Sequence, residues 1–333
     1  MIIDIHAHYV PPALLDVLHE GQREFPSVGV KRNDKGLQLS FAGGAPTRPV
    51  SPRLSDAPSR IDWMAEQGID RQVVGGWLDM FGYELPADEG AAWSRLLNEH
   101  MLTATTDVAE FVPLASVPLQ DGRLAARILN EAMDAGFPGA MIGTQPRGVG
   151  GGLDDPDLDP FWQAASDRNA TVFIHPMFAC GDDRLADYGL VNAVGRVTDS
   201  TIAVARLLYA GHLTRFPGMN VVLSHGGAAL PFILGRLRRN QELHRELADP
   251  QAEFRKLYFD TVVFEPAALR FLRDVAGAGR LMLGSDQPFP IGDPAPQQVV
   301  RSAALDAAEE RMILGETAAG LFLAAGCGCG RNH

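Results

Sequence analysis

The first ten residues, MIIDIHAHYV (1–10), carry the pattern from which the fold follows. They form a short apolar run that ends at two histidines, His6 and His8. Because side chains along a strand alternate between its two faces, His6 and His8 would point to the same side of one buried strand. Seven more short apolar runs occur along the chain. The eight runs predicted to form strands are residues 1–8, 71–77, 110–117, 139–144, 170–176, 219–227, 256–263 and 280–286.

Apolar residues at helical spacing occupy the segments between these runs. In residues 58–70, Ile61 and Met64 share one helical face, and Gly68 suits the C-terminal cap. Buried strands that alternate with helices predict an α/β fold whose eight parallel strands close into a (β/α)8 barrel, the TIM barrel. A doubly wound open sheet would use similar elements. However, no G-x-G-x-x-G motif follows a strand, so a dinucleotide-binding fold is not expected.

An insertion after the first predicted strand, at about residues 25–58, interrupts the barrel pattern. Residues 28–41 alternate around an Asn-Asp-Lys-Gly turn and predict a hairpin. A Pro-rich loop, residues 43–58, follows it. We expect the insertion to lie on the rim of the barrel that holds the carboxyl ends of the strands, where barrel enzymes bind their substrates.

One domain, residues 1–324, is expected to account for nearly the whole chain of 333 residues. Residues 325–333 are Gly-rich and predict a flexible C-terminal tail. The alternative is that Cys327, Cys329 and His333 of this tail bind a metal ion.

Composition limits the partners and the compartment of the protein. The net charge of −12 argues against nucleic acid as a partner, because phosphate binding requires basic patches. No apolar run reaches the roughly 20 residues of a membrane-spanning helix, so no membrane association is expected. The N-terminus lacks the features of a signal peptide, and the chain has three cysteines. These observations predict a cytoplasmic protein.

Polar residues end four of the eight predicted strands. His6 and His8 end the first, His175 the fifth, His225 the sixth and Asp286 the eighth. In a parallel barrel the carboxyl ends of all strands meet on one face, which is where barrel enzymes keep their active sites. The five side chains are therefore expected to lie close together.

Each of these residues taken alone has a simpler interpretation. A His-x-His pair can be incidental, a histidine after an apolar run can be a hydrogen-bonded core residue, and an aspartate can cap a helix. The complete set is hard to explain by packing, because buried polar groups cost free energy unless they are paired or bind a metal.

We therefore predict a metal centre with four ligands and a neighbouring general base. The ligands are His6, His8, His175 and Asp286, and the candidate general base is His225. Imidazoles combined with one carboxylate favour zinc, with manganese, iron and cobalt as alternatives.

A series of motifs in one order resembles a known family. The chain contains DIHAHYVP (4–11), TRPV (47–50), RIDWMAEQGIDRQVV (60–74), MFGYE (80–84), VPLQD (117–121), IHP (174–176), SHGGAALPFILGR (224–236) and LMLGSDQPFPIGD (281–293). Together they resemble the amidohydrolase superfamily and, within it, the family of aminocarboxymuconate semialdehyde decarboxylases. The resemblance covers the chain almost from end to end and implies the same barrel.

The resemblance also implies roles for individual residues. It assigns metal binding to His6, His8, His175 and Asp286, and a catalytic role to His225 in the His-Gly-Gly motif. Binuclear members of this barrel class commonly bridge two metals with a carboxylated lysine on the fourth strand. Residues 139–148, GAMIGTQPRG, contain no lysine, so we expect one divalent metal ion per chain.

Three further residues match positions at which the family contacts its substrate. The resemblance implies that Arg48 contacts a substrate carboxylate and that Phe289 forms a wall of the pocket. It also implies a homodimer in which Arg236 enters the active site of the neighbouring subunit. Without the resemblance, Arg48 would be read as a solvated loop charge and Arg236 as a charge on a helix surface.

The implied activity is that of a metal-dependent nonoxidative decarboxylase, a carboxy-lyase, acting on a small unsaturated or aromatic carboxylic acid. In this activity His225 and Asp286 are the catalytic residues. The alternatives are a hydrolase or hydratase that uses the same centre on a lactone, amide or alkene, and a non-catalytic metal-binding protein. The chain departs from the family on the substrate side, with Met177 and Phe178 after the His-Pro pair and Gln287 after the metal aspartate.

Overall fold

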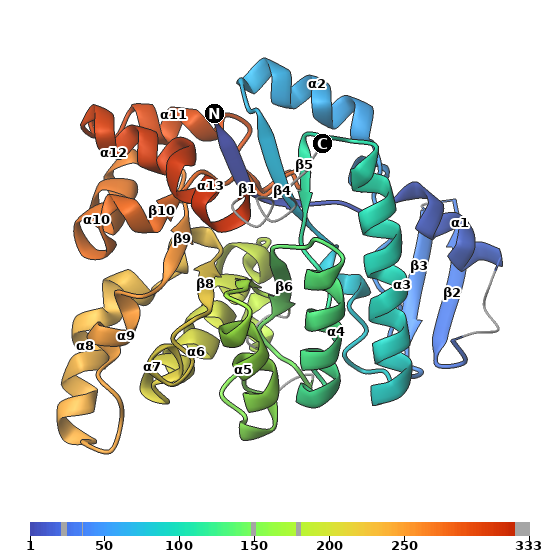
Figure 1. Ribbon diagram of the computed structural model, residues 1–333, viewed down its shortest axis with the longest axis horizontal. Coiled ribbons are helices and arrows are strands. Elements are labelled where there is room, and N and C mark those ends of the chain that lie inside the picture. Colours follow the sequence, from blue (N-terminus) through green and yellow to red (C-terminus); the bar gives the residue numbers. More distant parts are fainter. Residues whose placement is uncertain (21–24, 35, 148–150, 178–180, 324–333) are drawn as a thin grey trace, which may run out of the picture.

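Eight parallel strands form the centre of the computed structural model, with helices around them (Figure 1). The structure describes residues 1–20, 25–34, 36–147, 151–177 and 181–323. The barrel strands are β1 (Ile3–His8), β4 (Arg71–Gly75), β5 (Phe111–Pro113), β6 (Gly139–Gly143), β7 (Thr171–His175), β8 (Asn220–Leu223), β9 (Tyr258–Asp260) and β10 (Leu281–Met282). Each lies within one of the eight apolar runs, so the predicted barrel strands are confirmed.

Two links close these strands into a barrel. Strands β1, β4 and β5 pair in parallel in one sheet, and β6 to β10 pair in parallel in another. A bridge between Ala115 and Ala140 joins the first sheet to the second. At the other seam Ala7 bridges to Gln287, and the backbone N–H of His8 donates to the carbonyl of Gln287 at 2.7 Å. The carboxyl ends of all eight strands therefore meet on one face.

The helices lie outside the barrel, and most of them bury residues against it. Helix α2 shows how local sequence sets their ends: Asp56 accepts the N-terminal capping bond from Ser59, and Gly68 caps the C-terminus with φ 64°. This confirms the predicted cap. The helices are α1 (Pro12–Glu20), α2 (Ala57–Gln67), α3 (Ala87–Thr106), α4 (Gly122–Asp134), α5 (Asp159–Asp167), α6 (Arg196–Tyr209), α7 (His212–Arg215), α8 (Leu230–Leu243), α9 (Pro250–Phe254), α10 (Pro266–Ala276), α11 (Pro296–Arg301), α12 (Ala307–Arg311) and α13 (Thr317–Phe322).

The insertion after β1 contains the predicted hairpin. Strands β2 (Val28–Asn33) and β3 (Gly36–Phe41) pair antiparallel and lie at the side of the barrel, next to α1 and α3 (Figure 1). Leu39 and Phe41 of β3 pack with Trp93 of α3 in a hydrophobic cluster separate from the main core. The hairpin is thereby anchored, and the loop that follows it reaches the carboxyl-terminal face of the barrel.

Two sequence expectations stay outside what the structure describes. Residues 324–333 are not among the described residues, so the tail with Cys327, Cys329 and His333 is untested. The same holds for Phe178, three residues after His175. None of the helices in the described parts of the chain combines the length and the apolar character that crossing a membrane requires.

Candidate metal centre

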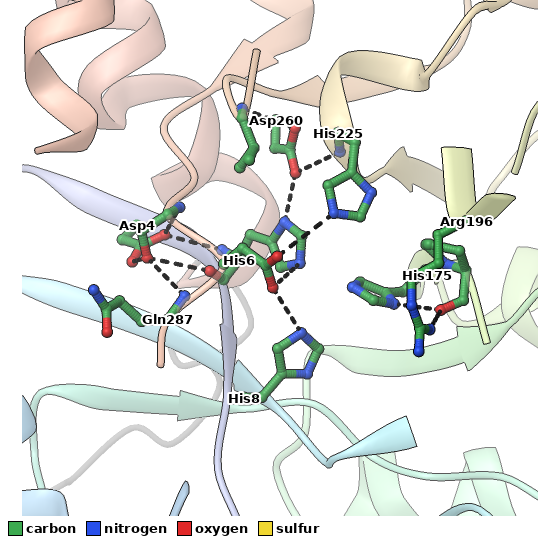
Figure 2. A network of polar contacts seen from close by, with 12 residues as sticks. Asp4, His6, His8, His175, Arg196, His225, Asp260 and Gln287 are labelled. Carbon is green, nitrogen blue, oxygen red and sulfur yellow. Dashed lines mark hydrogen bonds and ion pairs between the residues drawn. The ribbon is translucent and has the colours of Figure 1, made fainter. Parts of the chain in front are cut away.

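Three histidines and an aspartate meet at the carboxyl-terminal face of the barrel. His6 and His8 end β1, His175 ends β7, and Asp286 follows β10. The Nε2 atoms of His6 and His8 lie 3.4 and 3.3 Å from Oδ1 of Asp286. The ring of His175 stands 5.0 Å from that of His6 and 4.8 Å from that of His8, centroid to centroid. Figure 2 shows the His6 ring in the middle of this cluster.

The four atoms that face the middle of the cluster have no hydrogen-bond partner. They are Nε2 of His6, His8 and His175 and Oδ1 of Asp286, and all four are buried. A buried polar atom left unpaired costs about 1–3 kcal/mol, so four of them together need a common partner. One divalent cation satisfies three imidazole nitrogens and a carboxylate at once, and the residues therefore fit a single metal site.

The opposite nitrogen of each imidazole is held by an acceptor outside the cluster. Nδ1 lies 2.6 Å from Oδ2 of Asp260 in His6, 3.1 Å from the carbonyl of Gly76 in His8, and 2.9 Å from the carbonyl of Pro176 in His175. Because these oxygens accept, each Nδ1 carries the proton and each Nε2 presents its lone pair to the centre. This is the tautomer that metal binding requires.

Asp260 was not predicted from the sequence, although it ends strand β9. Its carboxylate accepts from the ring of His6, from the backbone N–H of His225 at 2.9 Å and from that of Gly226 at 2.7 Å. It thereby connects His6, an expected ligand, to the turn that carries His225. A signal was available, because Asp260 is a charged residue within the apolar run 256–263.

A second buried carboxylate supports the segment that carries Asp286. Asp4 accepts from the backbone N–H of Ser285 at 3.0 Å, from that of His6 at 3.1 Å and from Gln72 Nε2 at 2.7 Å. Gln72 in turn accepts from Arg60 at 2.8 Å. Burial raises the pKa of Asp4. This network ties β1 to the segment after β10 and so holds His6 and Asp286 in fixed positions relative to each other.

The electrostatic field of the cluster favours a cation. Burial lowers the pKa of His8, and it lowers that of His175 well below the usual value, which keeps both rings neutral and able to bind a metal. Burial alone would raise the pKa of Asp286, but His6, His225 and His8 outweigh it and hold that pKa well below its ordinary range. The carboxylate is therefore ionised.

His225 lies at the edge of the cluster rather than in its middle. It begins the short turn His225–Gly227 and has a positive φ of 55°. Its Nε2 lies 3.6 Å from Oδ2 of Asp286, and its side chain is 17% exposed, whereas those of His6 and His8 are fully buried. The candidate ligand atoms of His6, His175, His225 and Asp286 all lie within 4.8 Å of one another, a group that leaves out His8, so distance alone does not separate His225 from the expected ligands.

A cavity of about 770 Å³ opens above the cluster. His175, His225 and Asp286 form its floor, and most of its wall is apolar. The charged groups of its wall are Arg48, Asp79 and Arg196. A mostly apolar cavity with a few charged groups is typical of small-molecule sites.

The residues expected to contact a substrate differ in where they lie. Phe289 lines the cavity, with its ring 5.0 Å from that of His8. Arg48 lines it too, and its guanidinium is paired with Asp79. Arg236 is exposed on α8 and does not line the cavity of its own chain. Arg196, at the start of α6, was not predicted, because an arginine that begins a helix carries no recognisable signal.

Known proteins resemble this chain over most of its length. The chain is similar to a 2-amino-3-carboxymuconate-6-semialdehyde decarboxylase from Dictyostelium discoideum, with 29% identity over 309 residues, covering 90% of this chain and 85% of the relative. It is also similar to a 2-keto-4-carboxy-3-hexenedioate hydratase from Sphingobium sp., with 23% identity over 308 residues, covering 86% and 83%.

A solved structure shows the same fold. It is the 5-carboxyvanillate decarboxylase of Novosphingobium aromaticivorans, complexed with manganese and 4-hydroxy-3-methoxy-5-nitrobenzoic acid. It matches with a TM-score of 0.77 and 19% identity, covering 97% of this chain and 96% of that one. The family model described as amidohydrolase matches residues 3–323. Since that match spans the barrel and every residue of the metal cluster, the chain belongs to the amidohydrolase family.

Proposed function

We propose that the protein is a metal-dependent nonoxidative decarboxylase of a small unsaturated or aromatic carboxylic acid. The observation that carries this proposal is the set of four unpaired, buried ligand atoms at the floor of a mostly apolar cavity. Such a cavity accepts a flat conjugated body, while a divalent ion held at its floor and the arginines of its wall would attract a carboxylate. The decarboxylase and the hydratase described above both act on conjugated acids, which is consistent with this substrate class.

In this proposal His6, His8, His175 and Asp286 hold one divalent ion. Zinc is the first candidate for the donor set, and manganese is supported by its presence in the similar decarboxylase structure; iron and cobalt suit the same ligands. A divalent ion held there supplies a Lewis acid that stabilises negative charge on the oxygen atoms of the substrate.

The residues of the chain then have distinct tasks in decarboxylation. The carbon–carbon bond to the carboxylate breaks, carbon dioxide leaves, and the electron pair stays on the remaining carbon, where a conjugated ketone, enamine or phenol can spread it. That carbon then takes up a proton. His225 and Asp286 lie on the cavity floor, 3.6 Å apart, and are the groups placed to hold and transfer this proton. Arg48 and Phe289 orient the acid from the wall.

A hydratase is the second candidate, because a hydratase is among the similar proteins. The same residues could activate water and add it to a conjugated double bond, with His225 moving the proton. This reaction conserves the carboxylate, whereas decarboxylation releases it, so the two candidates differ in their products.

One experiment separates these candidates. The metal-reconstituted protein is incubated with 2-amino-3-carboxymuconate-6-semialdehyde, 5-carboxyvanillate and 2-keto-4-carboxy-3-hexenedioate. We expect trapped carbon dioxide to match the acid consumed, and no release by the Asp286→Ala protein. Addition of water without carbon dioxide would establish the hydratase instead. A metal-loaded protein that changes none of these acids would contradict both candidates.

We also propose a homodimer in which Arg236 enters the site of the neighbouring subunit. Arg236 points to solvent on α8, away from its own cavity. Four residues earlier on the same helix, Phe232 is 84% exposed, and its ring lies 6.2 Å from that of Phe271, which is 43% exposed. Exposed aromatic residues beside a charged one are typical of a protein interface.

A further inference from the structure

The two arginines of the cavity differ in how their charges are balanced. Arg48 makes two hydrogen bonds to Asp79, from Nε to Oδ2 at 3.0 Å and from Nη2 to Oδ1 at 3.2 Å. This paired contact offsets the charge of Arg48. Among the described residues, no carboxylate oxygen lies within 4.0 Å of the guanidinium of Arg196. Arg196 is therefore the cavity cation with no carboxylate partner in that part of the chain.

Neutral oxygen atoms hold Arg196 in place. Its Nε donates to Oδ1 of Asn192 at 2.8 Å, and its Nη1 donates to the carbonyl oxygens of Met177 at 3.1 Å and Pro176 at 3.4 Å. Its other terminal nitrogen, Nη2, makes no hydrogen bond to a described residue. The side chain is thus ordered before any ligand binds, which lowers the entropic cost of using it to bind an anion.

The nearest carboxylate on the same helix is engaged elsewhere. Asp199 lies one turn after Arg196 and accepts hydrogen bonds from Thr144 and from Gln145, the latter at 2.7 Å. Asp79, Asp286 and Asp199 act in the opposite direction, but the pKa of Arg196 is lowered, first by burial and then by the like charge of Arg48. Both effects make the charged guanidinium costly without a counterion, so an anionic group in the cavity would be favourable there.

We propose that Arg196 binds a second anionic group of the substrate, so that the site selects small unsaturated or aromatic dicarboxylates over monocarboxylates. This inference rests on the proposed function, in which the reacting carboxylate lies at the metal centre. Arg196 and the ligand His175 lie side by side (Figure 2), and both line the cavity. A substrate whose first carboxylate reaches the floor can therefore present a second one to Arg196.

A purely structural role for Arg196 is the competing explanation. The carbonyl of Pro176 accepts from Arg196 and also lies 2.9 Å from Nδ1 of His175. If Arg196 merely held this carbonyl, its removal would disturb His175, lower metal binding and weaken the binding of all acids alike. If Arg196 binds the second anionic group, its removal would weaken the binding of dicarboxylates alone.

The test measures binding and does not depend on turnover. Calorimetric titration of the metal-loaded protein uses two matched pairs of acids: 4-hydroxyisophthalate against salicylate, and muconate against sorbate. In each pair the first acid carries one more carboxylate. We expect the dicarboxylate of at least one pair to bind roughly ten- to a hundredfold more tightly, the scale of one charged hydrogen-bonded contact.

Variants then identify the residue that causes the preference for the dicarboxylate. Arg196→Met should bring the affinity ratio of the pair to about one, with salicylate or sorbate affinity and metal content unchanged, and Arg196→Lys should retain part of the ratio. The double variant Arg48→Met/Asp79→Asn removes a net-neutral pair and should retain the ratio. Arg206→Met is the matched control, because Arg206 lies on the same helix and pairs with Asp154 outside the cavity.

Three outcomes would overturn the inference. The first is equal affinities within both pairs of acids for the unaltered protein. The second is an affinity ratio that survives in Arg196→Met. The third is that both Arg196 variants lose metal and bind all the acids more weakly to the same extent. A ratio lost in the Arg48/Asp79 double variant but kept in Arg196→Met would assign the second anion to Arg48. A confirmed ratio without carbon dioxide release from any acid would leave this inference standing and contradict the decarboxylase proposal.

Discussion

Nδ1 of His6 lies 2.6 Å from Oδ2 of Asp260, and both side chains are fully buried. The two residues are 254 positions apart in the chain, at the ends of β1 and β9. The contact sets the tautomer of His6, and the same carboxylate holds the backbone of His225. One carboxylate thus orients both a candidate metal ligand and the candidate general base.

The first prediction concerns this carboxylate. In Asp260→Asn an amide NH2 group replaces one carboxylate oxygen. That NH2 group then faces either the N–H of the His6 ring or a backbone N–H, and the donor that it faces loses its acceptor. We expect metal affinity to fall roughly ten- to a hundredfold, as for other residues that orient a metal ligand. Competition with a chelator measures it. Asp274→Asn, at an exposed position on α10, is the control, and equal affinities in both variants would contradict this role.

The second prediction is one tightly bound divalent ion per chain. Elemental analysis of the protein purified with metal supplied should give about one ion, because one divalent cation can satisfy the four unpaired atoms together. Asp286→Ala removes the carboxylate that contacts both His6 and His8, and should abolish metal binding and activity. Two ions per chain, or full metal retention in Asp286→Ala, would show that the ligand set is wrong.

The third prediction separates His225 from the ligands. His225→Ala should retain the metal and lose at least roughly a hundredfold in kcat, the usual scale for losing a general acid or base. Metal content and kcat are measured on the same preparation. His225 is partly exposed to the cavity, unlike His6 and His8, which is the basis for this expectation. Loss of metal from His225→Ala would make His225 a ligand.

The fourth prediction tests the shared site. Arg236→Ala and His225→Ala should each be nearly inactive, with Arg236→Ala retaining its metal. When the two variants are mixed and exchange subunits, one site of each mixed dimer contains an intact His225 and an intact Arg236, so activity should partly return. Arg239→Ala mixed with His225→Ala is the control, since Arg239 pairs with Glu242 on the same helix. A fully active monomer, or exchange without recovery, would rule out the shared site.

The fifth prediction concerns the packing of the barrel. A Cβ atom at Gly139 would lie 1.9 Å from the carbonyl oxygen of Thr171 on the neighbouring strand, so β6 and β7 could not keep their spacing. Gly139→Ala should lower the free energy of unfolding by more than about 2 kcal/mol, measured by chemical denaturation. Gly320→Ala in α13, where a Cβ meets no atom within 4 Å, should be neutral or stabilise by up to about 1 kcal/mol. Similar changes in both variants would argue against this strand contact.

The sequence determined the barrel and the members of the candidate metal cluster. Strand positions follow from apolar runs, and the side on which His6 and His8 lie follows from the two-residue repeat of a strand. Both are local properties of the chain. Once eight strands run in parallel, their ends must share one face, so His175, His225 and Asp286 had to join that pair.

The tertiary structure alone decided which charges are paired. Arg48 and Asp79 are 31 positions apart, and no periodicity relates them, yet their contact leaves Arg196 as the cavity cation without a carboxylate partner among the described residues. Likewise, Asp260 could be seen as a strand-end carboxylate, but not as the acceptor for His6. Whether a charge is neutralised depends on which segments meet within a few ångströms, and the Coulomb energy falls with that distance. The sequence contains the groups, and the folded chain sets the distances between them.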